Sequence, residues 1–499
     1  MKYSGSIRLY LFVSLVPIVV FTGCSQETSA SVNSNKPPLS NSQKQQRPES
    51  LVYDLSQIRQ TFMGFGAQIW SYCSDEDYPD LLSWRQKALE ELNIKYVRVV
   101  KESASWEDLQ KTRAMTDALG IKWVYMIWSA PRQYSSRRLL TDIPGFADWW
   151  VSEVDNLYKH NIPVEYIELM NEPDSEGKWS TGITGSQYND LIKDLRPKLD
   201  RAGYSRVGIV GPGISSLSWS RPDEYIKFFD KTLASSMAAW STHSWDDDKK
   251  GPTDIESFWP NFGRPVSELN SSLPKFVTEY ATKQKSFHGI EYPMPDDYGQ
   301  WDDSKVYPYY STTNITPYAA RVYANTFALL NSGANALFIW QLSDEPTEVN
   351  PLGRRGGKHK SWGLLDLWGK PKPVYPALLT LYPKIPIGSK MVKSPDQKSN
   401  KLYTGVLVND KQVIIGVAND NPSPNSGTIH LKNVPSDLRI IKAEAFEPVY
   451  IGDRTKGEPD RGKMVKKDLT LTKEQTGQYS IKVSLPADSI LTIICQGGP

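Results

Sequence analysis

Between Gly64 and Trp340 the sequence alternates short apolar runs with segments of helical periodicity, and it does so eight times. Parallel strands need a long crossover, usually a helix, so a chain that places a helix after every strand builds a parallel sheet. Eight such units over roughly three hundred residues predict an α/β fold, a closed (β/α)₈ barrel. We expect its strands at 64–67, 96–100, 123–128, 166–170, 207–210, 239–243, 276–279 and 336–340.

Helix boundary signals support this alternation. Ser105 and Asp108 have the spacing of a capping box, and Gly120 follows that helix as a stop. Pro317 in a first turn and Gly333 past the end delimit the last helix before the eighth strand.

The pattern changes after Tyr382. Six short β-type runs separated by Asn, Asp, Gly and Pro follow, and no helical segment lies between them. This pattern is typical of an all-β sandwich. We therefore predict a barrel over 63–382 and a sandwich over 383–499, with residues 51–62 adding a strand to the sandwich.

The N-terminus has the pattern of an export signal over 1–24, with a basic start and an apolar run from Leu9 to Phe21. It ends in Phe-Thr-Gly-Cys, which resembles the lipobox of bacterial lipoproteins and implies acylation of Cys24 and a membrane-anchored, exported protein. An ordinary secretory signal with a chance cysteine is the alternative. Residues 25–50 predict a flexible linker. Of the other two cysteines, Cys73 and Cys495, we expect two separate buried thiols rather than a pair.

Composition excludes several classes of protein. The 58 Lys and Arg residues against 56 Asp and Glu leave a net charge of +2, which argues against a nucleic-acid partner. Three cysteines exclude a disulfide scaffold, and five scattered histidines argue against a metal enzyme. The 16 tryptophans and 26 tyrosines instead suit a cleft that stacks on sugar rings or bases.

Four predicted barrel strands carry an ionisable residue at or near their C-terminal ends: Arg98, Glu172, His243 and Glu279. Barrel enzymes place their active sites at this rim, and an unpaired charge there is costly. Two carboxylates that converge on one cleft are what glycoside hydrolysis requires, one as proton donor and one as nucleophile.

The sequence Leu-Met-Asn-Glu-Pro at 169–173, with Glu279 at the end of the seventh strand, resembles glycoside hydrolase clan A. Within that clan, residues 60–67 (Gln-Thr-Phe-Met-Gly-Phe-Gly-Ala) resemble the opening of family 30. The segments 382–389 and 485–489 resemble its C-terminal closure. Family 39, which also joins a barrel to a β-domain, is the close alternative.

The resemblance implies a retaining glycosidase that needs no cofactor, with Glu172 as acid/base and Glu279 as nucleophile. Asn171 would bind the 2-hydroxyl of the reacting sugar, or else cap the following helix. Arg98 would keep Glu279 ionised, although a structural ion pair is the alternative.

Three further residues are candidates for substrate contact. His243 on the sixth strand is expected near the nucleophile, with a satisfied buried histidine as the alternative. Trp128 ends the third strand, and Trp340 on the eighth is a candidate floor for the sugar at the reaction centre rather than a core residue.

Two long segments follow strands of the predicted barrel. The aromatic-rich stretch 284–316 is expected to form a wall of the cleft. The stretch 353–362 holds Arg354 and Arg355 among four permanent positive charges, which predicts an acidic glycan, uronic-acid-substituted or sulfated. A solvated loop is the alternative. A surface lipoprotein that binds glycans on the same fold without turnover is the competing function, but such a protein would be expected to lack one of the two carboxylates.

Overall fold

The computed structural model describes residues 49–70, 80–101, 104–136, 139–175, 180–245, 247–292, 312–346, 359–360, 362–366, 369–395, 397, 402–436, 438, 440–451, 461–475 and 477–497. Cys24, Cys73, Arg354 and Arg355, and most of the 284–316 segment, lie outside these residues. Within this part of the chain no helix is both long and apolar enough to cross a lipid bilayer.

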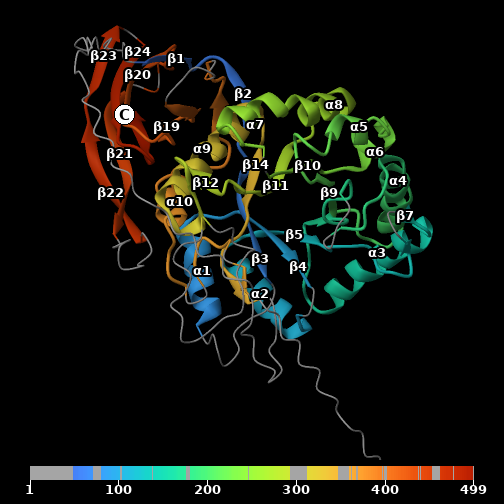
Figure 1. Ribbon diagram of the computed structural model, residues 1–499. Helices are drawn as coiled ribbons and strands as arrows, with labels where there is room; N and C mark the ends of the chain where they lie inside the picture. The colour runs from blue at the N-terminus through green and yellow to red at the C-terminus, as the bar shows by residue number, and fades with distance from the viewer. Residues whose placement is uncertain are drawn as a thin grey trace, which may run out of the picture. The chain divides into compact units, whose positions relative to one another are not determined.

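Eight parallel strands close into a barrel in which each strand pairs with the next one along the chain. They are β3 (Gly64–Trp70), β4 (Tyr96–Val100), β5 (Lys122–Met126), β8 (Tyr166–Glu168), β9 (Gly208–Ile214), β10 (Ala239–Ser244), β11 (Lys275–Tyr280) and β14 (Ala336–Ile339). All eight predicted strands are present, so the predicted fold class is confirmed (Figure 1).

Helices follow each strand and cover the barrel. They are α1 (Leu81–Glu91), α2 (Trp106–Ala118), α3 (Ile143–Lys159), α4 (Gly185–Arg201), α5 (Pro222–Ile226), α6 (Lys231–Ser236), α7 (Pro252–Phe258), α8 (Pro260–Asn270), α9 (Thr316–Ser332) and α10 (Val374–Leu379). The capping box of α2 is confirmed, since Ser105 and Asp108 exchange side-chain and backbone hydrogen bonds of 3.0 and 3.2 Å. Gly333 ends α9 with a φ of 121°, a conformation that glycine adopts without strain.

The C-terminal module is a β-sandwich. One sheet has the order β2–β17–β18–β19–β25–β21–β22 and the other β1–β20–β24–β23. The strands are β1 (Glu49–Asp54), β2 (Ile58–Thr61), β17 (Lys390–Val392), β18 (Tyr403–Val408), β19 (Gln412–Asn419), β20 (Asn425–Lys432), β21 (Ile440–Ile451), β22 (Arg461–Leu469), β23 (Leu471–Gln475), β24 (Gln478–Leu485) and β25 (Ser489–Gly497). Apolar residues of both sheets, including Tyr53, Ile415 and Ile481, share one core.

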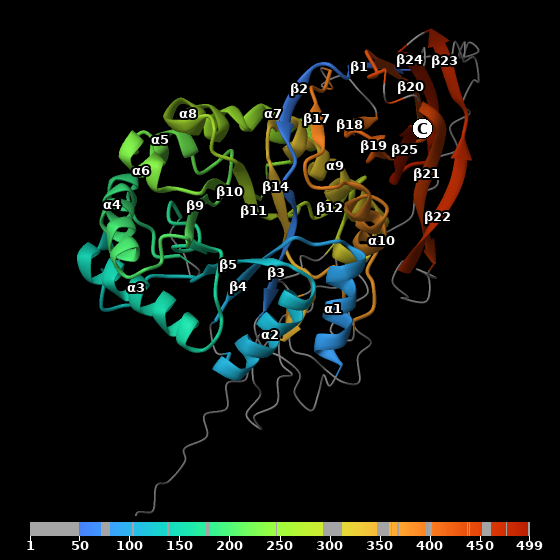
Figure 2. The same ribbon diagram turned by 180° about the vertical axis from the view of Figure 1, so that it is seen from behind.

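The N-terminal segment contributes one strand to each sheet of the sandwich. β1 runs parallel to β20, and β2 pairs antiparallel with β17. Figure 2 shows this blue segment passing from the red and orange strands into β3 of the barrel. Sequence reasoning predicted one strand in residues 51–62 and missed β2, and it also missed β17, β22 and β23. Strands β2 and β17 are only four and three residues long, and β22 and β23 are rich in lysine and other polar residues, as edge strands often are.

Helix α9 joins the barrel to the sandwich and is buried along nearly its whole length. Its Phe327 ring occupies the space above Gly405 and Gly416, where an added Cβ would lie only 2.0 and 1.8 Å from ring atoms. Tyr323 on the same helix hydrogen bonds to Thr492 of β25 at 2.7 Å. Cys495 of β25 is buried and free.

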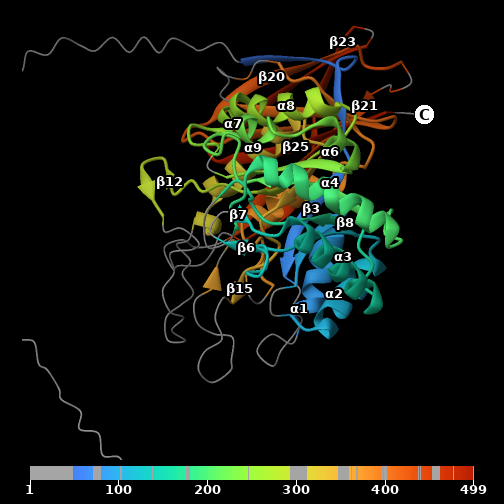
Figure 3. The ribbon, with the colours of Figure 1, turned by 90° about the vertical axis from the view of Figure 1, so that its right-hand side faces the viewer.

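Short hairpins follow three of the barrel strands. They are β6 (Ser135–Ser136) with β7 (Leu139–Leu140), β12 (Ser286–Phe287) with β13 (Ile290–Glu291), and β15 (Glu345–Pro346) with β16 (His359–Lys360). Figure 3 labels β6, β7, β12 and β15 to the left of β3. Because they come after β5, β11 and β14, they belong to the C-terminal rim. Two single 3₁₀ turns, η1 (Thr312–Asn314) and η2 (Tyr382–Lys384), complete the described elements.

Candidate active site

The two predicted carboxylates lie together at the C-terminal end of the barrel. Glu279 is the penultimate residue of β11, and Glu172 comes four residues after the end of β8. One oxygen of Glu172, one oxygen of Glu279 and a ring nitrogen of His243 all lie within 4.8 Å of one another. The barrel therefore brings together three residues that are far apart in the chain, since Glu172 and Glu279 are separated by 107 positions.

Arg98 is the centre of a buried polar network beneath these carboxylates. Its side chain, fully buried in β4, donates to Glu279 through Nη1 and to Glu168 through Nε, the latter at 2.6 Å. Nη2 donates to Oδ1 of Asn171 at 2.9 Å. A guanidinium without solvent needs such partners, because moving an unpaired charge into the interior costs several kcal/mol. Arg98 thus forms a structural ion pair and also touches the candidate nucleophile.

Glu168 is a buried carboxylate of this network that sequence reasoning missed. Burial alone would raise its pKa, but the charge of Arg98 and hydrogen bonds from Arg98 and Thr278 outweigh that effect, and the pKa lies below the ordinary value. Thr278 and Ser241 donate to its Oε1 at 2.8 and 2.9 Å. The signal was present in the sequence, because Glu168 is an ionisable residue in an otherwise apolar barrel strand. The same criterion identified Arg98.

Glu172 has a different environment from Glu279. It adopts a φ of 41°, in the left-handed region, and its side chain is 22% exposed. Burial raises its pKa to about 7, and the charges of Lys283 and Arg98 offset only part of this. Glu279, in contrast, accepts from Arg98 and also from Nε1 of Trp245 at 3.1 Å. One carboxyl is therefore suited to hold a proton near neutrality, and the other is paired with a permanent cation.

His243 lies between the two glutamates. Its Nδ1 is 3.1 Å from Oε1 of Glu172 and 3.6 Å from Oε2 of Glu279. Burial lowers the pKa of the imidazole, and Nε2 has no hydrogen-bond partner among the described residues. Because both neighbours of Nδ1 accept hydrogen bonds, we assign the proton of a neutral ring to Nδ1.

Tryptophans surround the carboxylates. Trp70, Trp128, Trp245, Trp340 and Trp362 belong to one apolar cluster. Their ring centroids are 5.3 to 6.3 Å apart in five contacting pairs, most of them edge to face. Trp340 is 7% exposed and Trp128 remains partly exposed. Such a wall excludes water and presents apolar faces on which a sugar ring can stack.

The structure brings Arg98, Asn171, Glu172, His243 and Glu279 into one site and places Trp128 and Trp340 beside it. Beyond Glu168, sequence reasoning also missed Trp70, Trp245, Trp362 and Gln341, whose Oε1 accepts from Nε1 of Trp70 at 2.5 Å. Trp70 is the last residue of β3, whereas Trp245, Gln341 and Trp362 lie in loops, and sequence periodicity does not indicate which side chains at these places point into the site. Of the predicted wall, the described part includes Phe287, which is buried in the main core, and Tyr292, which packs against it.

Glu172, His243 and Glu279 could also hold a metal ion by their mutual distances. The guanidinium of Arg98 already supplies a positive charge to Glu279, and Nδ1 of His243 faces both carboxylates. This donor set fits proton transfer and nucleophilic attack better than it fits a second cation.

The sequence matches no known family model and no curated protein. Among solved structures, a family 30 endoxylanase from Clostridium papyrosolvens C71 matches with a TM-score of 0.62 at 15% identity. The match covers 90% of this chain and 100% of the endoxylanase chain. A family 39 enzyme from Xanthomonas axonopodis pv. citri has a TM-score of 0.56 at 12% identity, over 92% and 100% of the two chains. A monomeric β-xylosidase from Caulobacter crescentus CB15 reaches 0.56 at 14% identity, over 90% and 100%.

The chain thus has the fold of clan A glycoside hydrolases, with structural neighbours in both families that the sequence resembles. At 12 to 15% identity this likeness concerns the fold, and the chemistry has to be argued from the site itself.

Proposed function

We propose that this protein is a retaining glycoside hydrolase in which Glu279 is the nucleophile and Glu172 the general acid/base. The observation that carries the proposal is a pair of carboxylates with oxygens within 4.8 Å of each other, only one of which is ion-paired to Arg98. Retaining enzymes keep their two carboxyl groups about 5 Å apart, whereas inverting enzymes need about 6.5 to 9.5 Å to admit a water molecule.

In the first step, an oxygen of Glu279 attacks the anomeric carbon while the bond to the leaving oxygen breaks. Glu172 transfers its proton to that oxygen. In the second step, Glu172, now ionised, removes a proton from water, whose oxygen attacks the anomeric carbon and releases Glu279. Because Arg98 holds Oδ1 of Asn171, the amide nitrogen is the end of that side chain able to donate to a sugar hydroxyl.

Digestion of a panel of polysaccharides, followed by product sizing and NMR of the newly formed anomeric centre, tests this proposal. The expected result is release of a product with the configuration of the substrate. Inversion, or saturable glycan binding without any product, would contradict it. The second outcome would favour a non-catalytic glycan-binding protein.

The rate on unactivated glycans is expected to fall as pH rises through about 7. Glu172 must be protonated to donate in the first step, and burial raises its pKa to about 7, so the acidic form is lost above that pH. We expect kcat/KM to fall about tenfold per pH unit on the alkaline side. An aryl glycoside with an acidic leaving group serves as control, since it needs no proton and should lose this limb. An alkaline limb of equal size with both substrates would rule out Glu172 as its source.

We further propose that the substrate is an acidic glycan, recognised by Arg354 and Arg355. The double substitution Arg354→Ala/Arg355→Ala is expected to raise KM for a uronic-acid-containing or sulfated polymer about tenfold or more, because charge-assisted hydrogen bonds are lost. KM for a neutral analogue should not change. Activity on the acidic polymer should also weaken with rising salt. If the enzyme prefers a neutral glycan and the double substitution does not change its KM, the proposed acidic substrate is refuted. The hydrolase assignment is not affected by that result.

We also propose that the protein is exported and anchored in a bacterial membrane through a lipid on Cys24. Replacing Cys24 by serine should move the protein from the membrane fraction to the soluble fraction of the producing cells, because the acyl chains supply the membrane affinity. Mass spectrometry of the mature N-terminus is the direct check. An unmodified residue 24 in membrane-associated protein would contradict the proposal.

A further inference from the structure

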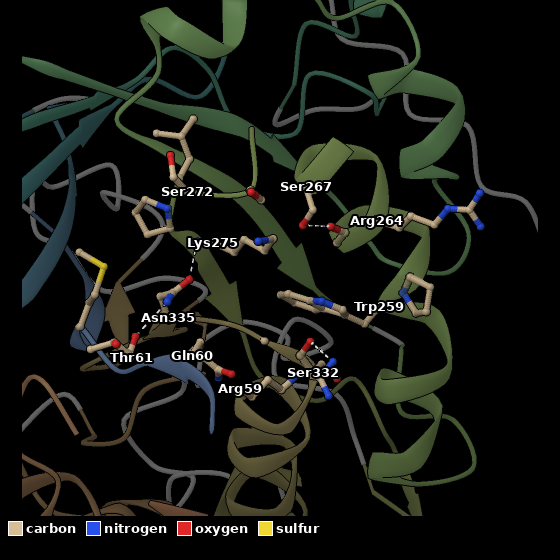
Figure 4. A pocket seen from close by; sticks show the side chains of 17 residues that line it. Arg59, Gln60, Thr61, Trp259, Arg264, Ser267, Ser272, Lys275, Ser332 and Asn335 are labelled. Atoms are coloured by element: carbon tan, nitrogen blue, oxygen red, sulfur yellow. Dashed lines mark hydrogen bonds between the residues drawn. The ribbon is translucent and has the colours of Figure 1, made fainter. Parts of the chain in front are cut away.

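A pocket of about 750 Å³ lies at the opposite end of the barrel from the glutamates. Met63, Lys275 and Asn335 in its wall stand at the starts of β3, β11 and β14. One face of α8, the end of α9 and strand β2 complete it (Figure 4). Its volume is within the range of about 300 to 1,000 Å³ that is typical of small-molecule sites.

The residues that line this pocket carry positive but no negative charge. The wall contains the side chains of Arg59, Lys275 and Arg264 but no aspartate or glutamate. Among the described residues, the ammonium group of Lys275 has neither an ion-pair nor a hydrogen-bond partner. Burial first, and then the charge of Arg59, lower the pKa of Lys275. The two cations therefore repel each other, and Glu256, which is not part of the wall, offsets some of the charge of Arg59.

Arg59 has N–H donors that are not used in hydrogen bonds among the described residues. Its Nη2 donates to the carbonyl of Ser332 at 2.8 Å, and in the described structure its other N–H groups meet no acceptor. A Cβ placed on Gly333 would lie 3.6 Å from Nε of Arg59 and 3.7 Å from Nε1 of Trp259, so both groups flank the same glycine. The indole N–H of Trp259 likewise has no acceptor in the part of the chain that the structure describes.

Two polar atoms of the wall are also unsatisfied. Oγ of Ser332, a residue only 5% exposed, and Oε1 of Gln60 are buried and have no hydrogen-bond partner among the described residues. A polar group buried without a partner costs free energy. The accessible wall thus offers two cations and an indole N–H, and rotation of the Ser332 and Gln60 side chains would add a hydroxyl and an amide oxygen. This suits a ligand that carries one anionic group and several hydroxyls.

We propose that this pocket is a second, non-catalytic binding site for a sugar that carries a carboxylate, held between Lys275 and Arg59. Bidentate hydrogen bonding to a guanidinium and pairing with an ammonium are the ordinary means of holding a carboxylate. One sugar hydroxyl would accept from the N–H of Trp259, and others would meet Ser332 and Gln60 once these buried side chains rotate toward the pocket. The site needs neither Glu172 nor Glu279, so it stands whether or not the protein is a hydrolase.

Isothermal titration calorimetry with a diuronic acid as the probe tests the proposal. The protein is the full folded chain carrying Glu279→Gln to prevent turnover and Arg354→Ala/Arg355→Ala to remove the contacts proposed for an acidic sugar in the glutamate cleft. One equivalent is expected to bind. Lys275→Met and Arg59→Met, which keep an unbranched stem and remove the charge, should each raise the Kd about tenfold or more. The matched control is Arg264→Met. This residue borders the same pocket, but its guanidinium pairs with Glu268 at 3.1 Å and extends away from the pocket in Figure 4. Its loss should not change the Kd.

The outcomes separate the alternatives. Binding that survives both Lys275→Met and Arg59→Met overturns the proposal, because the sugar then binds elsewhere, including the glutamate cleft. Equal affinity for the neutral disaccharide overturns the role of the carboxylate. Inorganic phosphate that binds as tightly as the diuronic acid overturns the role of the sugar. Thermal unfolding of each variant verifies that it is folded. If either Lys275→Met or Arg59→Met is not folded, the Kd of the other variant decides whether the pocket binds the sugar.

Discussion

Replacing Glu279 by glutamine is expected to lower kcat on the order of 10⁴-fold or more and to abolish the covalent intermediate. The amide has almost the same shape as the carboxylate but cannot attack the anomeric carbon. Intact-protein mass spectrometry with a slow, activated 2-deoxy-2-fluoro glycoside should therefore show a glycosyl adduct on the parent protein and none on the variant.

The same substitution also removes a buried negative charge from Arg98, and a control has to separate the two effects. Glu168→Gln is that control, because Glu168 shares the guanidinium but lies inside the barrel strand. We expect Glu168→Gln to lower stability, since Arg98 loses a partner, and yet to form the adduct. If Glu168→Gln forms none and Glu279→Gln does, the nucleophile has been misassigned.

Replacing Glu172 by alanine is expected to lower the rate on unactivated glycans by about 10² to 10⁴-fold, the usual contribution of a general acid. Substrates with good leaving groups should still form the intermediate, which then accumulates because no base activates water. Added azide should restore turnover, since a small anion can enter the space of the lost carboxyl and needs no base. The product should be a glycosyl azide of retained configuration.

Glu172→Gln is the matched control for that rescue. The glutamine fills the space that the alanine leaves, so azide should restore much less turnover. If azide rescues a variant at Glu279 with retention and Glu172→Ala with inversion, the two roles must be exchanged.

The eight strands could be predicted because periodicity and burial are local properties. A barrel strand is covered on both faces, so it reads as a continuous apolar run, and any ionisable residue at its end is conspicuous. That is how Arg98, Glu172, His243 and Glu279 were found. The sandwich was predicted less completely, because edge strands such as β22 carry lysines and polar residues that resemble a loop.

By itself, the sequence determined the repeated strand–helix pattern, the strand-end carboxylates and the capping of α2, all of which depend on neighbours within a few positions. Only the tertiary structure decided that Arg98 binds Glu168 and Glu279 at once, that His243 faces both candidate catalytic carboxylates, and that five tryptophans form one cluster. It also decided that Glu172 has its pKa raised to about 7. The physical reason is that burial and electrostatic fields come from residues brought together by barrel closure, and no local pattern encodes the distance between them.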